Sequence, residues 1–230
     1  MAKRDRARKR KAKRAQEESK QQKTQMMMIG AFVLVIVAVI GYIGFFSDAN
    51  EPLQATERLL LDPVLGNPDA PITVEEWAAF ACPSCKAVHE QGIIDTVLER
   101  YPGQVKFVFR DFPVISPSYD RAAAEVAQCA FDQGNEQFWL LHDWLYTDAV
   151  QGRTTQNEII QAGGSLGMDV AELQSCVESN VHEETVLFDL QRAYAQNFNG
   201  TPTFVVNGQR MFSIQQVVET IESEIVRLGL

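Results

Sequence analysis

Apolar and polar residues alternate along residues 72–80, and this pattern predicts a β-strand with one face buried. Similar short runs predict further strands at 104–109, 203–206 and 209–212, the last two joined as a hairpin by Asn207-Gly208. Elsewhere apolar residues recur every three or four positions, which is typical of helices. The expected helices are 83–101, 118–133, 136–146, 155–162, 169–179, 181–198 and 213–228. We therefore expect an α/β fold with a helical insertion at about residues 116–199.

Residues 1–46 differ in composition from the remainder of the chain. Residues 1–25 carry 11 of the 21 Lys and Arg and 3 of the 30 Asp and Glu, a net charge of +8 that leaves −17 for the rest. Residues 26–46 contain no charged side chain, and 21 apolar residues are long enough to span a bilayer. Because basic residues before a span favour the cytoplasm, we expect a cytoplasmic tail, a single-pass anchor in the cell membrane and an extracytoplasmic domain.

Two alternatives apply to this N-terminal region. Ser47-Asp48-Ala49 weakly resembles a signal-peptide cleavage site, but the apolar run and the basic region are both longer than in a signal peptide. A basic tail can also bind nucleic acid, although the adjacent span makes contact with anionic lipid the preferred interpretation. We therefore expect a membrane as a partner and no nucleic acid. Residues 47–70 are polar and turn-rich, and they are interpreted as a linker and lead-in.

The chemistry that the sequence predicts centres on Cys82-Pro83-Ser84-Cys85, between the strand at 72–80 and the next helix. If Cys82 begins that helix, the free N–H groups of its first turn and the helix dipole favour the Cys82 thiolate, the nucleophile of disulfide exchange. Pro83 suits the first helical position, and Cys85 shares a helix face with Cys82, so the pair can form a disulfide. Half a zinc site is the alternative. However, the sequence holds no second Cys-x-x-Cys or His-x-x-x-His, so we expect no metal and no cofactor.

Glu76 interrupts the apolar face of the strand, six residues before Cys82. A carboxyl group there would be partly buried, with a pKa raised by desolvation, and could take or return the proton that Cys85 exchanges. The alternative is a glutamate on an edge strand whose side chain reaches solvent. The histidines are interpreted as surface or packing residues; they are His89, His142 and His182.

Three segments resemble DsbA-type thiol–disulfide oxidoreductases, which have a thioredoxin fold with an inserted helical domain. Residues 76–85 resemble the active-site strand and helix of this family. Ala122 to Ala130, with Phe138-Trp139, resemble its helical-domain signature. Residues 200–208 resemble its cis-proline loop and the hairpin that follows. The resemblance covers about residues 62–230. It implies a DsbA-like thioredoxin domain at 71–230.

The resemblance also implies roles for individual residues. Cys82 would be the attacking cysteine and Cys85 the resolving one, and Glu76 would be the buried proton-transfer acid. The cis-proline pair, Thr201-Pro202, would bind the extended backbone of the substrate.

Redox tuning is expected from the two residues between the cysteines, Pro83 and Ser84. Strong oxidants of this family have a histidine at the Ser84 position, which helps stabilise the thiolate. Serine can donate a hydrogen bond but carries no charge, so the sequence leaves the oxidising strength open.

The two remaining cysteines are Cys129 and Cys176. Four cysteines allow three pairings, and once Cys82 is paired with Cys85 only this pair is left. An even number of cysteines outside the cytoplasm suits a compartment where disulfides persist. A structural disulfide here would contribute about 4 kcal/mol in the chain-entropy model. Two buried free thiols are the main alternative, and a resolving role for this pair in disulfide exchange is a minor one.

Together these features predict an extracytoplasmic oxidoreductase that introduces disulfides into exported proteins bearing free thiols, by exchange through Cys82–Cys85. Re-oxidation would require a partner, for which we expect a quinone-linked membrane protein. One alternative is an isomerase or reductase that uses the same residues at a lower potential. Another is a chaperone-like binding module in which the Cys-x-x-Cys motif is only structural.

Overall fold

The computed structural model describes residues 61–230. The basic tail at 1–25, the predicted membrane span at 26–46 and the linker up to residue 60 lie outside these residues. Within residues 61–230, no helix is long and apolar enough to cross a membrane.

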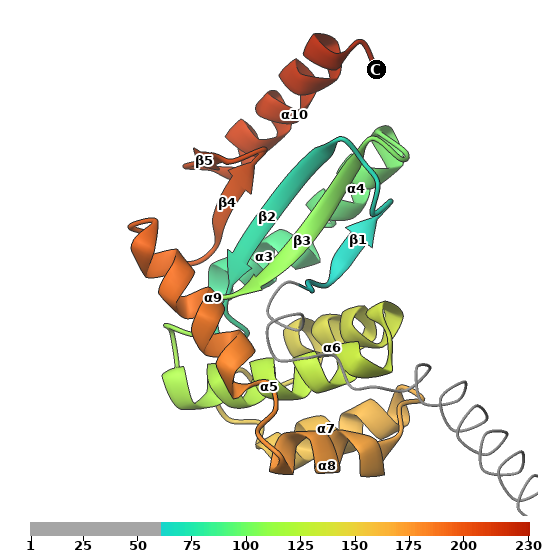
Figure 1. Cartoon of the computed structure of the whole chain (residues 1–230), viewed down its shortest axis with the longest axis vertical. Helices are drawn as coiled ribbons and strands as arrows, with labels where there is room; N and C mark the ends of the chain where they lie inside the picture. The colour runs from blue at the N-terminus through green and yellow to red at the C-terminus, as the bar shows by residue number, and fades with distance from the viewer. Residues whose placement is uncertain (1–60) are drawn as a thin grey trace, which may run out of the picture. The chain divides into compact units, whose positions relative to one another are not determined.

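A five-stranded mixed sheet forms the centre of the fold, in the order β1-β3-β2-β4-β5 (Figure 1). The strands are β1 (Val64–Gly66), β2 (Ile72–Ala78), β3 (Val105–Asp111), β4 (Thr203–Val206) and β5 (Gln209–Met211). β2 and β3 are parallel, and the other neighbouring pairs are antiparallel. β2 buries most of its side chains, as expected for a central strand with a neighbour on each side.

β1 was not expected, because the residues from Val64 onward contain Gly, Asn and Pro and predicted only turns. Its three residues pair with β3, with Val64 opposite Val108. Asn135 contacts the same strand: its side-chain carbonyl accepts the Val64 N–H (2.9 Å) and its amide donates to the Val64 carbonyl (2.7 Å). Backbone pairing from residues distant in sequence therefore stabilises a segment whose own sequence favours a turn.

Helices α4 (Ile93–Arg100) and α10 (Ile214–Leu228) pack against the sheet, and α3 (Pro83–Glu90) packs against α4. A single helix was expected over residues 83–101, but the structure has two. Gly92 separates them, because it adopts a left-handed conformation (φ 60°) and begins α4. α4 and α10 bury their apolar faces in one cluster with β2, around Ile72, Val74 and Ile221.

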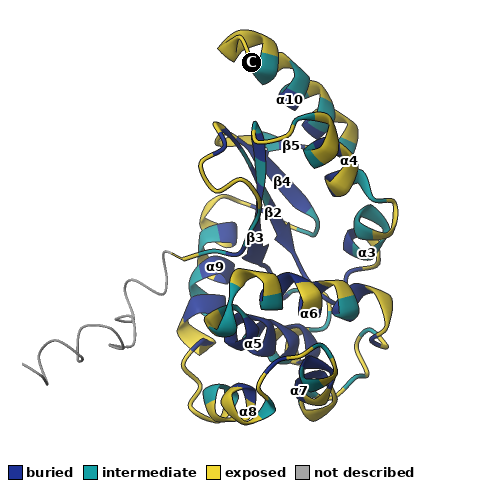
Figure 2. Cartoon of the chain, turned by 90° about the vertical axis from the view of Figure 1, so that its right-hand side faces the viewer, coloured by how far each residue is buried: buried dark blue, intermediate teal, exposed yellow. Residues whose placement is uncertain are grey.

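The helical insertion lies between β3 and β4, as the sequence predicted. It comprises α5 (Pro117–Gln133), α6 (Asn135–Thr147), α7 (Gln156–Ser165), α8 (Val170–Glu178) and α9 (Glu183–Ala195). α5 is buried over most of its length, and its many alanines allow the neighbouring helices to pack closely (Figure 2). The buried cluster of the insertion extends to residues 78–82 and to Cys85. The insertion therefore packs directly against the segment that carries the Cys-x-x-Cys motif.

Candidate active site

Cys82 is the N-cap residue of α3, with Pro83 in the first turn. Its backbone is extended (φ −81°, ψ 113°), and its sulfur accepts a hydrogen bond from the Cys85 N–H (3.2 Å). Both cysteines are free thiols and buried. The sequence prediction of a cysteine at the helix start, below the free N–H groups of the first turn, is therefore confirmed.

The two thiols have opposite acidities. Hydrogen bonding from the Cys85 side chain, supported by the N–H groups of Ser84 and Cys85, lowers the pKa of Cys82 to about 6 in spite of its burial. Burial raises the pKa of Cys85, and the hydrogen bond and charge of Cys82 raise it further. At neutral pH Cys82 is therefore mostly thiolate and Cys85 is a thiol, which is the division of roles that disulfide exchange needs.

The Thr201–Pro202 peptide bond is cis. This loop precedes β4 and lies against the Cys82 sulfur, which is 3.3 Å from the Thr201 carbonyl oxygen. Two segments 119 residues apart in sequence, the helix start and the proline loop, thus meet at one sulfur atom. The structure places both predicted residues of the cis-proline pair at the site.

Glu76 is only 4% exposed, although it is a carboxylic acid. It lies on the central strand β2, opposite Phe109 on β3 and Phe204 on β4, so the edge-strand interpretation is wrong. Burial, and then the negative charge of Cys82, raise the pKa of Glu76 to about 8. The charge of Glu76 in turn adds to the raised pKa of Cys85. A protonated carboxyl group therefore stands within electrostatic reach of the thiol pair at neutral pH.

Asp120 is a site residue that the sequence analysis missed. One of its carboxylate oxygens accepts the N–H of Ala81 (2.7 Å), directly before Cys82. The other oxygen accepts the N–H groups of Ile115 and Ser116 (3.1 and 2.7 Å). The carboxylate is buried and ties the residue before Cys82 to the start of α5. Local sequence offered no signal for this role, because Ala81 and Asp120 are 39 residues apart.

Two more side chains of the insertion support the same segment. The Tyr146 hydroxyl donates to the Ala79 carbonyl (3.2 Å), and the Gln151 amide donates to the Phe80 carbonyl (2.8 Å). Tyr146 is buried, and burial raises the pKa of its hydroxyl well above the usual value, so the hydroxyl stays a donor. With Asp120, the insertion therefore fixes the three consecutive residues before Cys82.

A buried cluster of charges lies between the sheet and α9. Arg110 pairs with Asp62, and its guanidinium is 3.6 Å from Glu75 and 3.8 Å from Asp189. Burial raises the pKa of Asp62 to about 6 and that of Asp111 to about 7. Carboxyl groups outnumber the guanidinium in this cluster, so part of it holds protons near neutral pH. Its contacts join the lead-in and two strands to α9, which indicates a structural role.

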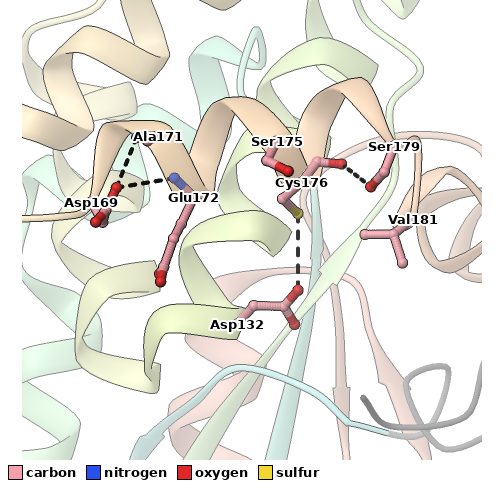
Figure 3. Close-up of a pocket in the computed structure, with 8 residues that line it drawn as sticks. All are labelled: Asp132, Asp169, Ala171, Glu172, Ser175, Cys176, Ser179 and Val181. Atoms are coloured by element: carbon pink, nitrogen blue, oxygen red, sulfur yellow. Dashed lines mark hydrogen bonds between the residues drawn. The ribbon is translucent and has the colours of Figure 1, made fainter. Parts of the chain in front are cut away.

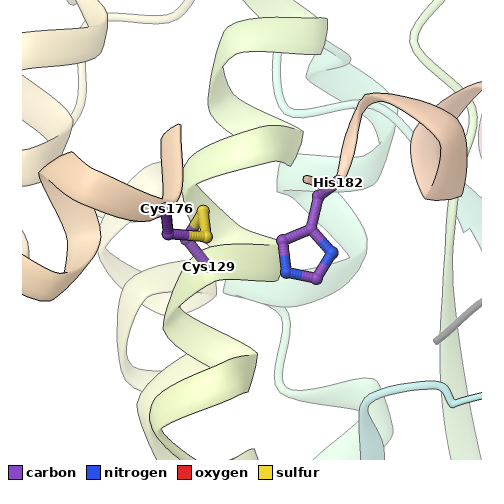
Figure 4. A group of neighbouring side chains, drawn as sticks. All are labelled: Cys129, Cys176 and His182. Atoms are coloured by element: carbon purple, nitrogen blue, oxygen red, sulfur yellow. A yellow bond between two sulfur atoms is a disulfide. The ribbon is translucent and has the colours of Figure 1, made fainter. Parts of the chain in front are cut away.

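The remaining two cysteines form the disulfide Cys129–Cys176, which links α5 to α8 (Figure 4). His182 lies beside it, and its Nε2 is 2.8 Å from a carboxylate oxygen of Asp132. An open hollow of about 510 Å³ runs along α8 and contains neither Cys82 nor Cys85 (Figure 3). The residues that line it are Asp132, Asp169, Ala171, Glu172, Ser175, Cys176, Ser179 and Val181. We assign no part of the thiol chemistry to this hollow.

Comparisons with known proteins agree with this geometry. Residues 60–224 match the thioredoxin family. The chain is 26% identical over 196 residues to the "Probable disulfide bond formation protein D" of Bacillus cereus, which covers 80% of this chain and 89% of that protein. The crystal structure of oxidised BdbD from Bacillus subtilis superposes with a TM-score of 0.64 at 27% identity, covering 71% of this chain and 92% of that one.

A further relative has a different name. The Na(+)/H(+) antiporter NhaA 1 of Mycolicibacterium gilvum is 30% identical over 208 residues, which covers 84% of this chain. The match covers 32% of the antiporter, so the chain spans about a third of the length of that relative. The name describes the activity of that longer protein, and we do not assign antiport to this chain. The site geometry and the matched family agree: the chain belongs to the thioredoxin family.

Proposed function

We propose that this chain is an extracytoplasmic disulfide donor that oxidises pairs of thiols in exported proteins. The observation that carries the proposal is the position of Cys82 at the start of α3, where the Cys85 N–H donates to its sulfur (3.2 Å) and the pKa of the thiol is lowered. A thiolate stabilised in the reduced enzyme makes the oxidised Cys82–Cys85 pair a better oxidant. The meeting of the proline loop with this sulfur supports it, because the loop offers backbone groups beside the reacting atom.

Catalysis begins with oxidised Cys82–Cys85. A substrate thiolate attacks the Cys82 sulfur, the enzyme disulfide breaks, and a mixed disulfide forms between Cys82 and the substrate. The leaving group is the Cys85 thiolate, whose raised pKa favours immediate protonation. Glu76 supplies this proton, because its pKa of about 8 keeps it protonated at neutral pH.

A second substrate thiolate then attacks the substrate sulfur of the mixed disulfide. The substrate leaves with one disulfide, and Cys82 leaves as a thiolate whose pKa of about 6 makes it a good leaving group at neutral pH. The enzyme has gained two electrons and holds a dithiol. Its re-oxidation passes these electrons to a partner, for which we propose a quinone-linked membrane protein.

The proposal also places the enzyme at the membrane. Residues 26–46 form the anchor and residues 1–25 stay in the cytoplasm, because a basic segment precedes an uncharged apolar run of spanning length. The anchor would hold the catalytic domain close to a membrane re-oxidant and to proteins emerging from the export machinery.

Disulfide transfer under single-turnover conditions tests the proposal. The oxidised full chain is mixed with a reduced, unfolded secreted protein, and the thiols of both are counted by alkylation and mass spectrometry. We expect one disulfide gained by the substrate for each enzyme molecule reduced at Cys82 and Cys85. Cys85→Ser should accumulate the mixed disulfide when its Cys82 is presented with an oxidised substrate, and Cys82→Ser should do nothing.

The result that contradicts the proposal is a substrate that stays reduced while Cys82–Cys85 stays oxidised. Disulfide reshuffling in a scrambled substrate without net oxidation would instead identify an isomerase. A matched control is Cys129→Ala/Cys176→Ala, which removes the disulfide between α5 and α8 and retains the reactive pair.

A further inference from the structure

Two of the three histidines in the chain meet at the junction of the sheet domain with the insertion. His89 lies in the last turn of α3 and His142 on α6, and these helices pack against each other (Figure 2). Asp143 follows His142. Its Oδ1 is 3.1 Å from His142 Nδ1 and 3.7 Å from His89 Nε2. One ligand atom from each of the three residues lies within 4.8 Å of the other two.

These distances suit a metal ion. Four ligands placed tetrahedrally at about 2.1 Å from Zn²⁺ are about 3.4 Å from one another, which lies between the two distances to Asp143 Oδ1. Two imidazoles and one carboxylate are the donor set of divalent first-row transition metals, and three protein ligands leave a position for water.

A cavity adjoins the three side chains and supplies an independent observation. It has a volume of about 100 Å³, and Trp139 and Asp95 also line it. The indole N–H of Trp139 is buried and has no hydrogen-bond partner among the described residues. Such a donor needs an acceptor. A water molecule bound to a metal ion at the cluster would provide one.

We propose that His89, His142 and Asp143 bind one divalent transition metal ion, for which Zn²⁺ is the probe. The site would connect the helix that begins at Cys82 to the helical insertion. Because α3 carries both the reactive cysteine and a ligand, an ion bound here would stabilise the packing of α3 on α6. The site uses neither of the reactive sulfurs, so it stands apart from the disulfide exchange proposed above.

Zinc titration of the full chain, purified without a histidine tag and stripped by a chelator, tests this inference. The protein is kept oxidised, because the dithiol form of Cys82 and Cys85 would itself bind zinc. Competition with a chromophoric chelator should show one saturable site per chain. We expect His89→Ala and Asp143→Asn each to weaken Zn²⁺ binding by at least about tenfold, because even the loss of a residue that only supports a ligand costs about 10–100-fold.

Glu136→Gln is the matched control, because it removes an exposed carboxylate from the first turn of the same helix. It should leave Zn²⁺ affinity unchanged. The Asp143 side chain is 56% exposed, so Asp143→Asn should fold normally even if a histidine variant does not. The inference is overturned if no saturable site is found, or if Asp143→Asn retains affinity within tenfold of the unaltered chain. It is equally overturned if Glu136→Gln weakens binding as much as Asp143→Asn.

Discussion

Replacing Glu76 by glutamine removes a titrating group from the centre of the sheet and keeps its size. Glu76 is buried on the central strand, where its register partners are Phe109 and Phe204, and its pKa is raised to about 8 by burial first and by Cys82 second. In the unfolded chain the same group has a pKa near 4.5. The folded protein therefore keeps a proton that the unfolded chain loses, and the stability this proton contributes falls as the pH rises from 4.5 through 8.

The size of the effect follows from the two pKa values. Each pKa unit corresponds to about 1.4 kcal/mol, so the unaltered protein should lose about 3 kcal/mol relative to Glu76→Gln between pH 5 and pH 8. Because burial is the larger cause of the shift, most of this loss should remain when Cys82 is in a disulfide. An unsatisfied buried amide costs about 1–3 kcal/mol at every pH, so only the pH dependence is diagnostic.

The assay is urea unfolding of the oxidised protein at several pH values from 5 to 8.5, for the unaltered chain, Glu76→Gln and the control Glu99→Gln. Glu99 is exposed on α4, so its replacement should leave the pH profile unchanged. We expect the stability difference between Glu76→Gln and the unaltered chain to grow steadily in favour of the glutamine variant as the pH rises. A difference that is the same at pH 5 and pH 8 would refute the reasoning.

Three further predictions concern residues of the site and its support. The reduced chain should gain thiolate absorbance at 240 nm with a midpoint near pH 6, a signal that Cys82→Ser should lack; a midpoint above pH 8 would show that the helix start does not acidify the thiol. Asp120→Ala should lower the free energy of unfolding by about 3 kcal/mol, because three backbone N–H groups lose a buried acceptor. Chemical denaturation measures this loss of stability, and a loss below about 1 kcal/mol would contradict the assigned role. Cys129→Ala/Cys176→Ala should lower the free energy of unfolding by up to about 4 kcal/mol in the same measurement, because the disulfide closes a long loop. The double variant should retain disulfide transfer. Loss of transfer in a folded variant would show that this pair takes part in exchange.

Features that depend on neighbouring residues could be predicted from the sequence. The alternation along residues 72–80 indicated both the strand and the burial of Glu76, because side chains of a strand alternate between faces. The position of Pro83 indicated that Cys82 begins a helix, since proline suits the first turn. The Asn207-Gly208 turn marked the hairpin of β4 and β5.

Features that arise from packing between distant segments could not be predicted. β1 has turn-forming residues and becomes a strand only through its neighbour β3 and the side chain of Asn135. Asp120 and Tyr146 have no local motif, and their roles exist only because the insertion folds back onto residues 79–81. The cluster of His89, His142 and Asp143 could not be predicted for the same reason, because its members come from two helices more than 50 residues apart.

The reduction potential of the Cys82–Cys85 pair tests the central claim most directly. The full chain would be equilibrated in glutathione buffers, and the fraction of reduced Cys82 would be read by alkylation. A Cys82 pKa of about 6 lies between the values of about 7 for thioredoxin and about 3.5 for DsbA. The account therefore predicts a potential between about −270 and −120 mV, high enough to donate disulfides to secreted proteins whose own potentials lie below about −300 mV. A potential at or below about −270 mV, the value of thioredoxin, would contradict it, because the pair would then be poised to act as a reductase.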